Sequence, residues 1–425
     1  MKVLYIVPRM TYGGGMPDVL SKVDEIRSIN PDLTATIVIL EPNLIAELLK
    51  RAVSKGIKVF MAPSEKILKK LIDASDLVVL QYWQCPSIFG FLRFLAVNQV
   101  NFRMIVNIHI NGFTLPQVVP DWVVSFADAC IKVHPRTPLA AGFRNIEIKF
   151  IPPLITTPLM PEDVGTKLFR PFRLYYAGTL NYFKAHPDFV GMHEGLNVDD
   201  YHFDLWGAGM DPAFEKSVQG SKRIRYRGFS ADIHSEMRPC HLLCNPQSEL
   251  SYGSYDKIMK ESQWMGIPVI VLKNSYIADH IEHFVNGIVA SDISEYRGFI
   301  EHLAADSDFY QRLSRSTFDH TRTSYNKTAF SKEILLLYQS VLQRPCKTVG
   351  ITLVPDHPFL AVMDGMGPWK RKILDRPSEL TASEINYALR CEGGLIHYLK
   401  AYPDETELKN KIIELLDLEK FADPF

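Results

Sequence analysis

Residues 245–271 read NPQSELSYGSYDKIMKESQWMGIPVIV and form the most informative stretch of the chain. They predict a polar loop after an apolar strand, a short helix that carries Glu261, and a Gly-x-Pro turn into a second buried strand. Parallel sheets present anion sites in this way, because a helix N-terminus exposes unpaired backbone N–H groups and the positive end of the helix dipole. We therefore predict that a phosphate binds at Ser254 and Tyr255, with Glu261 within reach of a sugar hydroxyl.

Short apolar runs alternate with helical patterns along most of the chain. Continuous apolar runs are typical of strands that helices cover on both faces, so we predict an α/β fold with parallel, doubly wound sheets. A Pro-rich segment from Pro152 to Pro171 indicates a boundary between two Rossmann-like domains, residues 1–155 and 171–342, which face each other across a ligand cleft. The runs expected to be strands are Val3–Val7, Thr36–Leu40, Lys58–Met61, Leu77–Tyr82, Met104–His109, Trp122–Phe126, Ala129–His134, Lys149–Ile151, Arg173–Gly178, Phe203–Gly207, Ile224–Gly228, His241–Asn245, Pro268–Leu272 and Gly287–Ala290.

Residues 345–425 differ from the rest and predict an α-rich C-terminal extension. We expect an apolar hairpin from Ile351–Leu353 and Phe359–Val362, followed by helices over Thr381–Leu389 and Glu405–Leu418. A capping-box sequence opens the first of these helices. No chemistry can be assigned here, and the expected roles are packing against the main body, shaping an acceptor site, or forming a homo-oligomer.

Composition narrows the class of protein. The formal net charge is −1, with 17 basic and 12 acidic residues over positions 1–150, so no dense basic stripe predicts nucleic-acid binding. Six scattered cysteines predict a reducing, cytoplasmic setting without a disulfide framework, and no apolar run is long enough to span a membrane. Cys240, His241 and Cys244 are interpreted as part of a buried strand and not as a metal site.

Other strand ends carry glycines and a lysine. Gly13–Gly15 precede a helix expected to begin near Asp18, and glycines without Cβ allow a ligand to approach the backbone there, although a tight turn is the alternative. Lys184 follows the strand that ends at Gly178 and, with the loop at 253–257, would form a two-point phosphate clamp. Gly207 would let a ligand approach the backbone, and the segment Arg227–Phe229 offers an aromatic ring for a nucleobase. Ordinary turns are the alternative at both positions.

Taken together, these segments resemble the retaining GT-B glycosyltransferases of the group 1, family 4 type, over about residues 1–340. The resemblance implies that Lys184 binds the donor diphosphate, that Glu261 holds the ribose, and that Ser254 and Tyr255 cradle the distal phosphate and sugar. The segments that carry it are Gly13–Gly15, His109, Gly178 to Lys184, Gly207–Gly209, Arg227-Gly228, Glu261 through Gly266-Ile267-Pro268-Val269, and Asn286-Gly287.

Two positions depart from the pattern of that family. Gly253 stands where a paired carboxylate is common, and Thr179 stands where a basic residue is common. Glu249 could replace the carboxylate, and Lys257 or Arg227 could supply the positive charge.

The resemblance predicts transfer of a sugar from a nucleoside-diphosphate sugar, as substrate, to an acceptor hydroxyl, with retention and without a metal or organic cofactor. The acceptor is open between a glycan, a lipid, a small molecule and a modified base in DNA. A non-catalytic nucleotide-sugar-binding protein is the alternative from another class. The predicted catalytic residues are His109 and Lys184, and the predicted donor-binding residues are Gly14, Gly15, Lys184, Gly207, Ser254, Tyr255 and Glu261.

Overall fold

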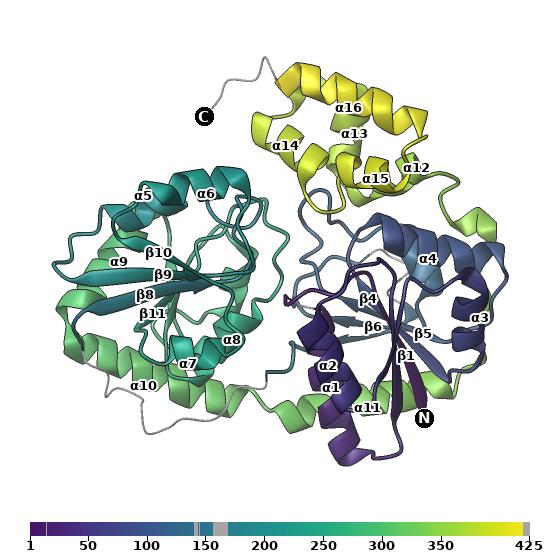
Figure 1. The fold of residues 1–425 in the computed structure, drawn as a ribbon, viewed down its shortest axis with the longest axis horizontal. Coiled ribbons are helices and arrows are strands. Elements are labelled where there is room, and N and C mark those ends of the chain that lie inside the picture. Colours follow the sequence, from purple (N-terminus) through teal and green to yellow (C-terminus); the bar gives the residue numbers. More distant parts are fainter. Residues whose placement is uncertain (14, 140–142, 144, 156–168, 420–425) are drawn as a thin grey trace. The chain divides into compact units, whose positions relative to one another are not determined.

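The computed structural model describes residues 1–425 except 14, 140–142, 144, 156–168 and 420–425. The chain divides into two compact units (Figure 1). Unit 1 combines Met1–Pro153 with Thr328–Phe425, and unit 2 is Leu154–Lys327. Most of the Pro-rich segment near residue 153, where the chain passes from unit 1 to unit 2, lies outside the described residues.

Unit 1 contains a seven-stranded parallel sheet in the order β3-β2-β1-β4-β5-β6-β7. The central strands are buried along almost their whole length, as continuous apolar runs predict. The order reverses between β1 and β4, which places a topological switch point in the middle of the sheet. The strands are β1 (Lys2–Val7), β2 (Thr34–Ile39), β3 (Lys58–Met61), β4 (Leu77–Tyr82), β5 (Met104–Ile108), β6 (Ala129–Lys132) and β7 (Glu147–Phe150).

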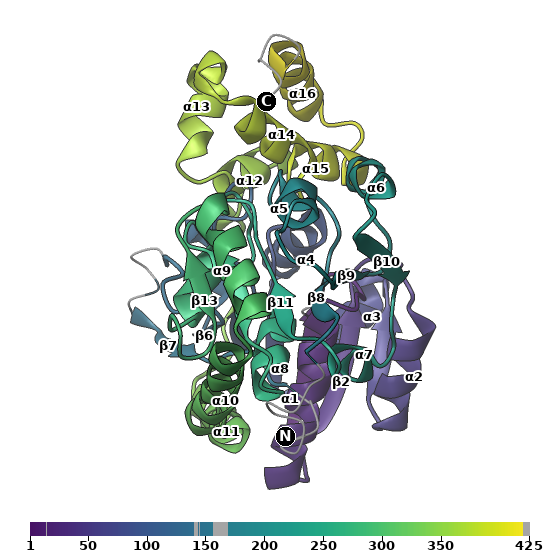
Figure 2. The same cartoon turned by 90° about the vertical axis from the view of Figure 1, so that its left-hand side faces the viewer.

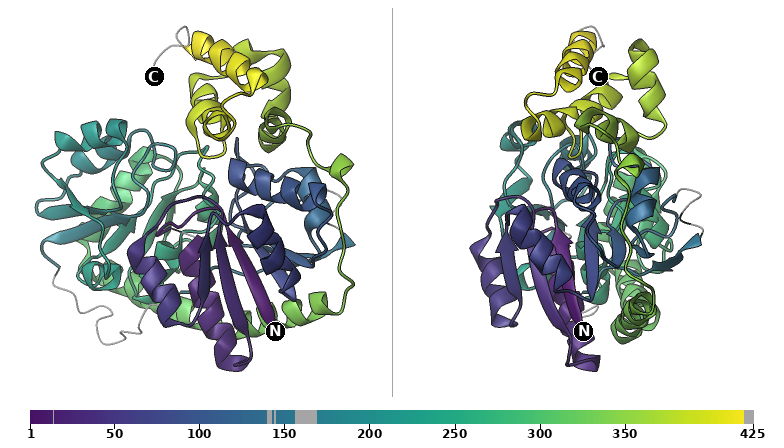
Figure 3. Two further views of the ribbon diagram at one scale, coloured as in Figure 1. Left: turned by 45° about the vertical axis from the view of Figure 1, so that its right-hand side comes forward. Right: turned by 90° about the vertical axis from the view of Figure 1, so that its right-hand side faces the viewer.

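Five helices accompany this sheet (Figures 1 and 3). The last of them follows unit 2 in the sequence, and its Tyr338 hydroxyl lies 3.4 Å from that of Tyr5 on β1. They are α1 (Gly15–Ile29), α2 (Ala46–Ser54), α3 (Glu65–Asp73), α4 (Pro86–Val97) and α11 (Lys327–Leu342).

The prediction of a strand at Trp122–Phe126 is wrong. Residues Asp121–Phe126 form a 3-10 helix, η1, which begins after Pro120 and buries Val123 and Phe126. Those two side chains are three positions apart, and this spacing puts them on one face of a 3-10 helix. The apolar run was too short for its periodicity to separate a strand from a buried helical turn.

Unit 2 contains a six-stranded parallel sheet in the order β10-β9-β8-β11-β12-β13. Successive side chains enter separate cores, with Leu174 in one cluster and Tyr175 in the other, because a strand points alternate residues to opposite faces. The strands are β8 (Phe172–Ala177), β9 (Tyr201–Trp206), β10 (Ile224–Gly228), β11 (Leu242–Cys244), β12 (Val269–Leu272) and β13 (Ile288–Ala290).

Helices cover both faces of this sheet (Figures 1 and 2). The two parallel sheets and their helices confirm the predicted α/β class. The helices are α5 (Phe189–Glu194), α6 (Pro212–Gln219), α7 (Ile233–Met237), α8 (Lys257–Trp264), α9 (Ile293–Ala305) and α10 (Ser307–Ser324).

The C-terminal extension is helical and belongs to unit 1. The predicted capping box is confirmed, since Thr381 and Glu384 each accept a backbone N–H from the other. The predicted hairpin is wrong: residues Ile351–Leu353 form a 3-10 turn, and Pro358 begins a helix because its fixed φ and missing N–H suit the first helical position. The helices are α12 (Pro358–Gly365), α13 (Trp369–Asp375), α14 (Ala382–Arg390), α15 (Leu395–Ala401) and α16 (Thr406–Glu419).

The extension packs against the rest of unit 1 at the loop after β4, beside helix α4 (Figure 3). The side-chain amide of Gln84 donates to the carbonyl of Ala361 and to the hydroxyl of Tyr398, at 2.9 and 3.2 Å. A Cβ on Gly393 would lie 2.3 Å from the carbonyl oxygen of Gln84, so only glycine allows this approach. Packing against the main body, one of the roles expected for the extension, is therefore observed.

No helix in the described ranges is long and apolar enough to cross a membrane.

Candidate functional site

Lys184 lies at the carboxyl end of the unit 2 sheet, in the loop after β8. Its Nζ lies 3.0 Å from Oδ1 of Asp256, the residue just before helix α8. The side-chain amides of Asn245 and Gln247 both donate to the other oxygen of Asp256, at 2.7 Å each. The carboxylate does not cap its own helix, and it is instead fixed from two further positions while it holds the ammonium group.

Backbone contacts join the two loops that carry this ion pair. The N–H of His186 donates to the carbonyl of Pro246, and the N–H of Ser248 donates to the carbonyl of Lys184, both at 2.9 Å. Because β8 and β11 are neighbours in the sheet, their following loops emerge at the same edge. The structure thus brings Lys184 and the 253–257 region together, as the two-point arrangement requires.

The ion pair keeps Lys184 charged. Burial alone would lower the pKa of its ammonium group, but the charge of Asp256 and the hydroxyl of Tyr176 outweigh burial and raise the pKa above its usual range. Its side chain is 20% exposed, so the ammonium is held firmly but still reaches the surface.

Glu261 lies on α8, and only 6% of its surface is exposed. Its Oε1 lies 3.5 Å from Nε2 of His234 on α7 and 3.6 Å from Nζ of Lys257. The carboxylate is therefore held between Lys257, one turn earlier on the same helix, and His234 of helix α7.

A cavity of about 440 Å³ opens near the ends of β9 and β10. Phe229 contributes a ring that is 42% exposed, and Glu236 lies on α7, the helix that also carries His234. The lining residues are Trp206, Arg227, Phe229, Ser230, Ala231 and Glu236. This cavity includes Arg227 and Phe229, which the sequence offered as groups for a nucleobase.

Ser254 and Tyr255 precede the helix and are not part of its first turn, because α8 begins at Lys257 with Asp256 as N-cap. The carbonyl of Ser254 accepts from Nε2 of His280 at 2.8 Å, and the ring of Tyr255 packs edge-on to the same imidazole at 4.6 Å. His280 thus fixes the loop that leads into α8.

Two glycines of unit 2 have clear structural reasons. A Cβ on Gly207 would lie 2.4 Å from the carbonyl oxygen of Gly178, so Gly207 permits close approach of two neighbouring strand ends. A Cβ on Gly253 would lie 2.8 Å from Oε1 of Gln247. The amide that anchors Asp256 therefore occupies the space of a longer side chain at position 253.

The residues offered as substitutes for the missing charges have other contacts. Glu249 is exposed and accepts from the side-chain amide of Asn274 at 2.7 Å, and Arg227 lies 2.8 Å from Asp204. Lys257 pairs with Glu261.

In unit 1, His109 directly follows β5 and its ring stacks on Trp83, with centroids 4.4 Å apart. Its Nε2 lies 2.7 Å from Oε1 of Gln81 and 3.9 Å from Oδ2 of Asp18. Burial lowers the pKa of His109 to about 3. The negative charge of Asp18 opposes this shift, and the positive charge of Lys22 adds to it. The imidazole is therefore neutral near pH 7 and acts as a hydrogen-bonding group.

Helix α1 begins at the glycine loop of unit 1, and Gly14 lies outside the described residues. A Cβ on Gly15 would lie 2.7 Å from the ring of Trp83, so this glycine makes room for the ring that stacks on His109. One turn on, Asp18 and Lys22 form a buried ion pair of 2.6 Å.

The sequence did not reveal Asp256, Trp83 or the pair of Asp18 with Lys22. The partners of Asp256 and Trp83 are distant along the chain, and the pair of Asp18 with Lys22 lies inside helix α1, just after the glycine loop. A carboxylate directly before Lys257 was visible, but nothing local indicated that it would face Lys184.

Comparisons with known proteins give the fold. No family model matches the chain, and no curated protein matches it by sequence. The crystal structure of Anabaena HepE with UDP-glucose is similar at a TM-score of 0.64 and 15% identity, over 80% of this chain and 100% of that one. A glycosyltransferase from Rickettsia africae gives 0.62 and 13%, over 81% and 99%. Sucrose-phosphate synthase from Thermosynechococcus elongatus gives 0.58 and 15%, over 80% and 98%.

The chain has the GT-B fold. About a fifth of it lies outside each of these matches, whereas the other proteins are covered almost completely.

Proposed function

We propose that this protein is a glycosyltransferase that moves a sugar from a nucleoside-diphosphate sugar to an acceptor hydroxyl. One observation carries the proposal: Lys184, Glu261 and the cavity beside Phe229 gather at the carboxyl edge of one parallel sheet. This edge is where α/β sheets bind nucleotides. The GT-B fold supports the same class, since HepE, which shares it, is crystallised with UDP and with UDP-glucose.

In this proposal Lys184, Glu261 and the cavity beside Phe229 each bind a different part of the donor. The ammonium of Lys184 binds the diphosphate, the carboxylate of Glu261 accepts from a ribose hydroxyl, and the nucleobase enters the cavity beside Phe229. Cleavage of the bond between the sugar carbon and the phosphate oxygen leaves negative charge on the β-phosphate. A preorganised cation lowers the barrier most where charge develops, so Lys184 is the central catalytic group.

Asp256 acts as a positioning residue for Lys184. Asn245 and Gln247 hold its carboxylate, so Asp256 stays in place when a diphosphate approaches the ammonium. A lysine has three N–H donors, which lets Lys184 contact the phosphate while it keeps the bond to Asp256.

We assign the acceptor side to unit 1. The neutral imidazole of His109 orients groups by hydrogen bonding and does not serve as the proton acceptor, because a base with a pKa of about 3 is too weak for that task. If the sugar is transferred with retention, the acceptor oxygen attacks from the face that the diphosphate leaves, and a phosphate oxygen takes its proton. Retention, transfer without a metal, roles for Gly14 and Gly15, and a cytoplasmic setting stay predictions.

A non-catalytic nucleotide-sugar-binding protein is the second candidate. Gly253 favours it, because the side chain of Gln247 fills the space beside a position where the family that the sequence resembles commonly has a carboxylate. Such a protein would bind nucleoside diphosphates through the same residues and release none from a donor.

Turnover separates the two candidates. The full chain is incubated with a panel of nucleotide sugars and mixed acceptors, and release of nucleoside diphosphate is measured. We expect release with one donor in wild type and in Lys222→Ala, an exposed lysine of the same unit, and release slowed by about 100-fold or more in Lys184→Ala. Binding of a nucleoside diphosphate without release from any donor would favour the second candidate.

A further inference from the structure

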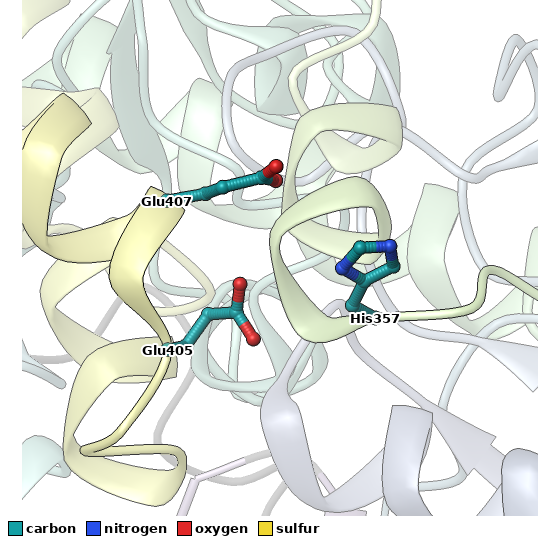
Figure 4. Close-up of side chains that lie close together, drawn as sticks. All are labelled: His357, Glu405 and Glu407. Carbon is teal, nitrogen blue, oxygen red and sulfur yellow. The ribbon is translucent and has the colours of Figure 1, made fainter.

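A histidine and two glutamates meet in the C-terminal extension, outside every residue assigned above to the donor. His357 precedes α12, Glu405 precedes α16, and Glu407 lies in the first turn of α16. One ligand atom from each lies within 4.8 Å of the others. Figure 4 shows both carboxylates projecting from the start of α16 toward the end of α12 that carries the imidazole.

Both segments that carry these side chains are attached to helix α4. Arg93 on α4 donates to the carbonyl of Pro355, two residues before His357, at 2.9 Å. Tyr402, three residues before Glu405, packs edge-on against Phe89 of the same helix, with ring centroids 6.1 Å apart. One rigid helix therefore sets the separation of the imidazole and the carboxylates, and the cluster does not depend on two independent loops.

Among the residues that the structure describes, the three side chains have no competing partners. Within the described ranges, neither glutamate makes an ion pair, and none of the three side chains makes a hydrogen bond. Carboxylates at the start of α16 are favourable to the helix dipole, which accounts for the glutamates alone. The dipole gives no reason for an imidazole beside them, whereas a cation satisfies all three groups at once.

We propose that His357, Glu405 and Glu407 bind a divalent first-row transition metal ion, with zinc as the reference ion. An imidazole nitrogen with two carboxylate oxygens is a nitrogen and oxygen donor set typical of zinc, and the imidazole disfavours calcium and magnesium, which prefer oxygen ligands. Ligand atoms on one tetrahedral zinc lie about 3.4 Å from one another. Small side-chain rotations that bring the ligand atoms closer by little more than about 1 Å therefore close the site. Three protein ligands leave one coordination position for water or an anion.

The site adjoins a cavity of about 470 Å³ that Glu405 also lines, with Phe89, Arg93, Pro358, Tyr402 and Asp404 among the other lining residues. The metal would fix α12 to α16 across this cavity and so hold the extension together. The proposal does not depend on the transferase function of the donor residues.

The test is zinc binding to the full chain after removal of bound metal with a chelator. All proteins carry Cys346→Ser, which removes an exposed thiol that could bind zinc elsewhere. Calorimetry should give a zinc site that weakens at least about tenfold in His357→Ala, Glu405→Gln and Glu407→Gln. Asp404→Asn, a matched change of charge in the same loop, should bind as the parent does.

Two further readouts complete the test. Zinc should raise the melting temperature of the parent protein and of Asp404→Asn but not of the triple variant, and bound Co²⁺ should show visible d–d bands only where the three ligands remain. Because the ligands lie at the surface, circular dichroism of the metal-free variants should match the parent. Equal zinc binding by the parent and the triple variant, or magnesium binding as tightly as zinc, overturns the proposal.

Discussion

Lys184 is the residue on which the proposed chemistry depends. We expect Lys184→Ala to slow sugar transfer by about 100-fold or more, because it removes a charged donor from the phosphate oxygen on which negative charge develops. Steady-state release of nucleoside diphosphate measures the effect, with Lys222→Ala as the control for loss of a lysine from unit 2. Wild-type turnover in Lys184→Ala would remove this residue from the mechanism.

Asp256 should act through the charge state and position of Lys184. In Asp256→Asn the ammonium loses the carboxylate that raises its pKa, so burial then lowers the pKa. Lys184 is charged below its pKa. As the pH is raised, turnover should therefore begin to fall at a lower pH in the variant than in wild type, and near neutral pH the variant should be about tenfold less active. An alkaline limb at the wild-type position would show that Asp256 has no such role.

His109 should make the stability of unit 1 sensitive to acid. Its folded pKa of about 3 lies below the ordinary value of about 6.5, so the unfolded chain takes up the proton first as the pH falls. From pH 6.5 downward this residue should lower the free energy of unfolding by about 1.4 kcal/mol per pH unit. Urea unfolding at several pH values should show a shallower slope in His109→Gln than in wild type or in the exposed control His302→Gln.

Continuous apolar runs predicted the strands of both sheets well, because a strand covered on both faces has to be apolar throughout. The errors, at 122–126 and at both halves of the expected hairpin (351–353 and 359–362), were short apolar runs, for which period and length give the same signal for a strand and for a buried helical turn. The expectation that Lys184 and the 253–257 loop lie at one sheet edge agrees with the structure, whereas their roles stay predictions. The sequence did not predict the roles of Asp256 and Trp83, because they contact residues at the end of another strand. Such contacts produce no regular spacing in the sequence.

The docking of the extension should depend on the glycine at position 393. Gly393 has φ of +83° and its Cβ position is 2.3 Å from the carbonyl oxygen of Gln84. Gly393→Ala should therefore lower the free energy of unfolding by about 1–3 kcal/mol, through strain and through loss of this approach. Gly350→Ala is the matched control, since its nearest neighbour lies 3.8 Å from the Cβ position, and it should change the free energy by less than about 0.5 kcal/mol. Equal stability of the two variants in denaturant would mean that the extension is not held at Gln84.

A nucleoside diphosphate that binds only the folded protein must stabilise the entire chain, by an amount that grows with the ratio of its concentration to its dissociation constant. At 100 times its dissociation constant it adds about 2.7 kcal/mol, which is readily seen as a rise in melting temperature. Among UDP, GDP and ADP, we expect one to raise the melting temperature of wild type and of the exposed control Glu215→Ala. Glu261→Ala should need about tenfold more of that nucleotide for the same rise, because its carboxylate is assigned to the ribose that all three share. Loss of response in Lys184→Ala but not in Glu261→Ala would leave the diphosphate assignment intact and move the ribose elsewhere, so this pair of variants tests the two halves of the donor site separately.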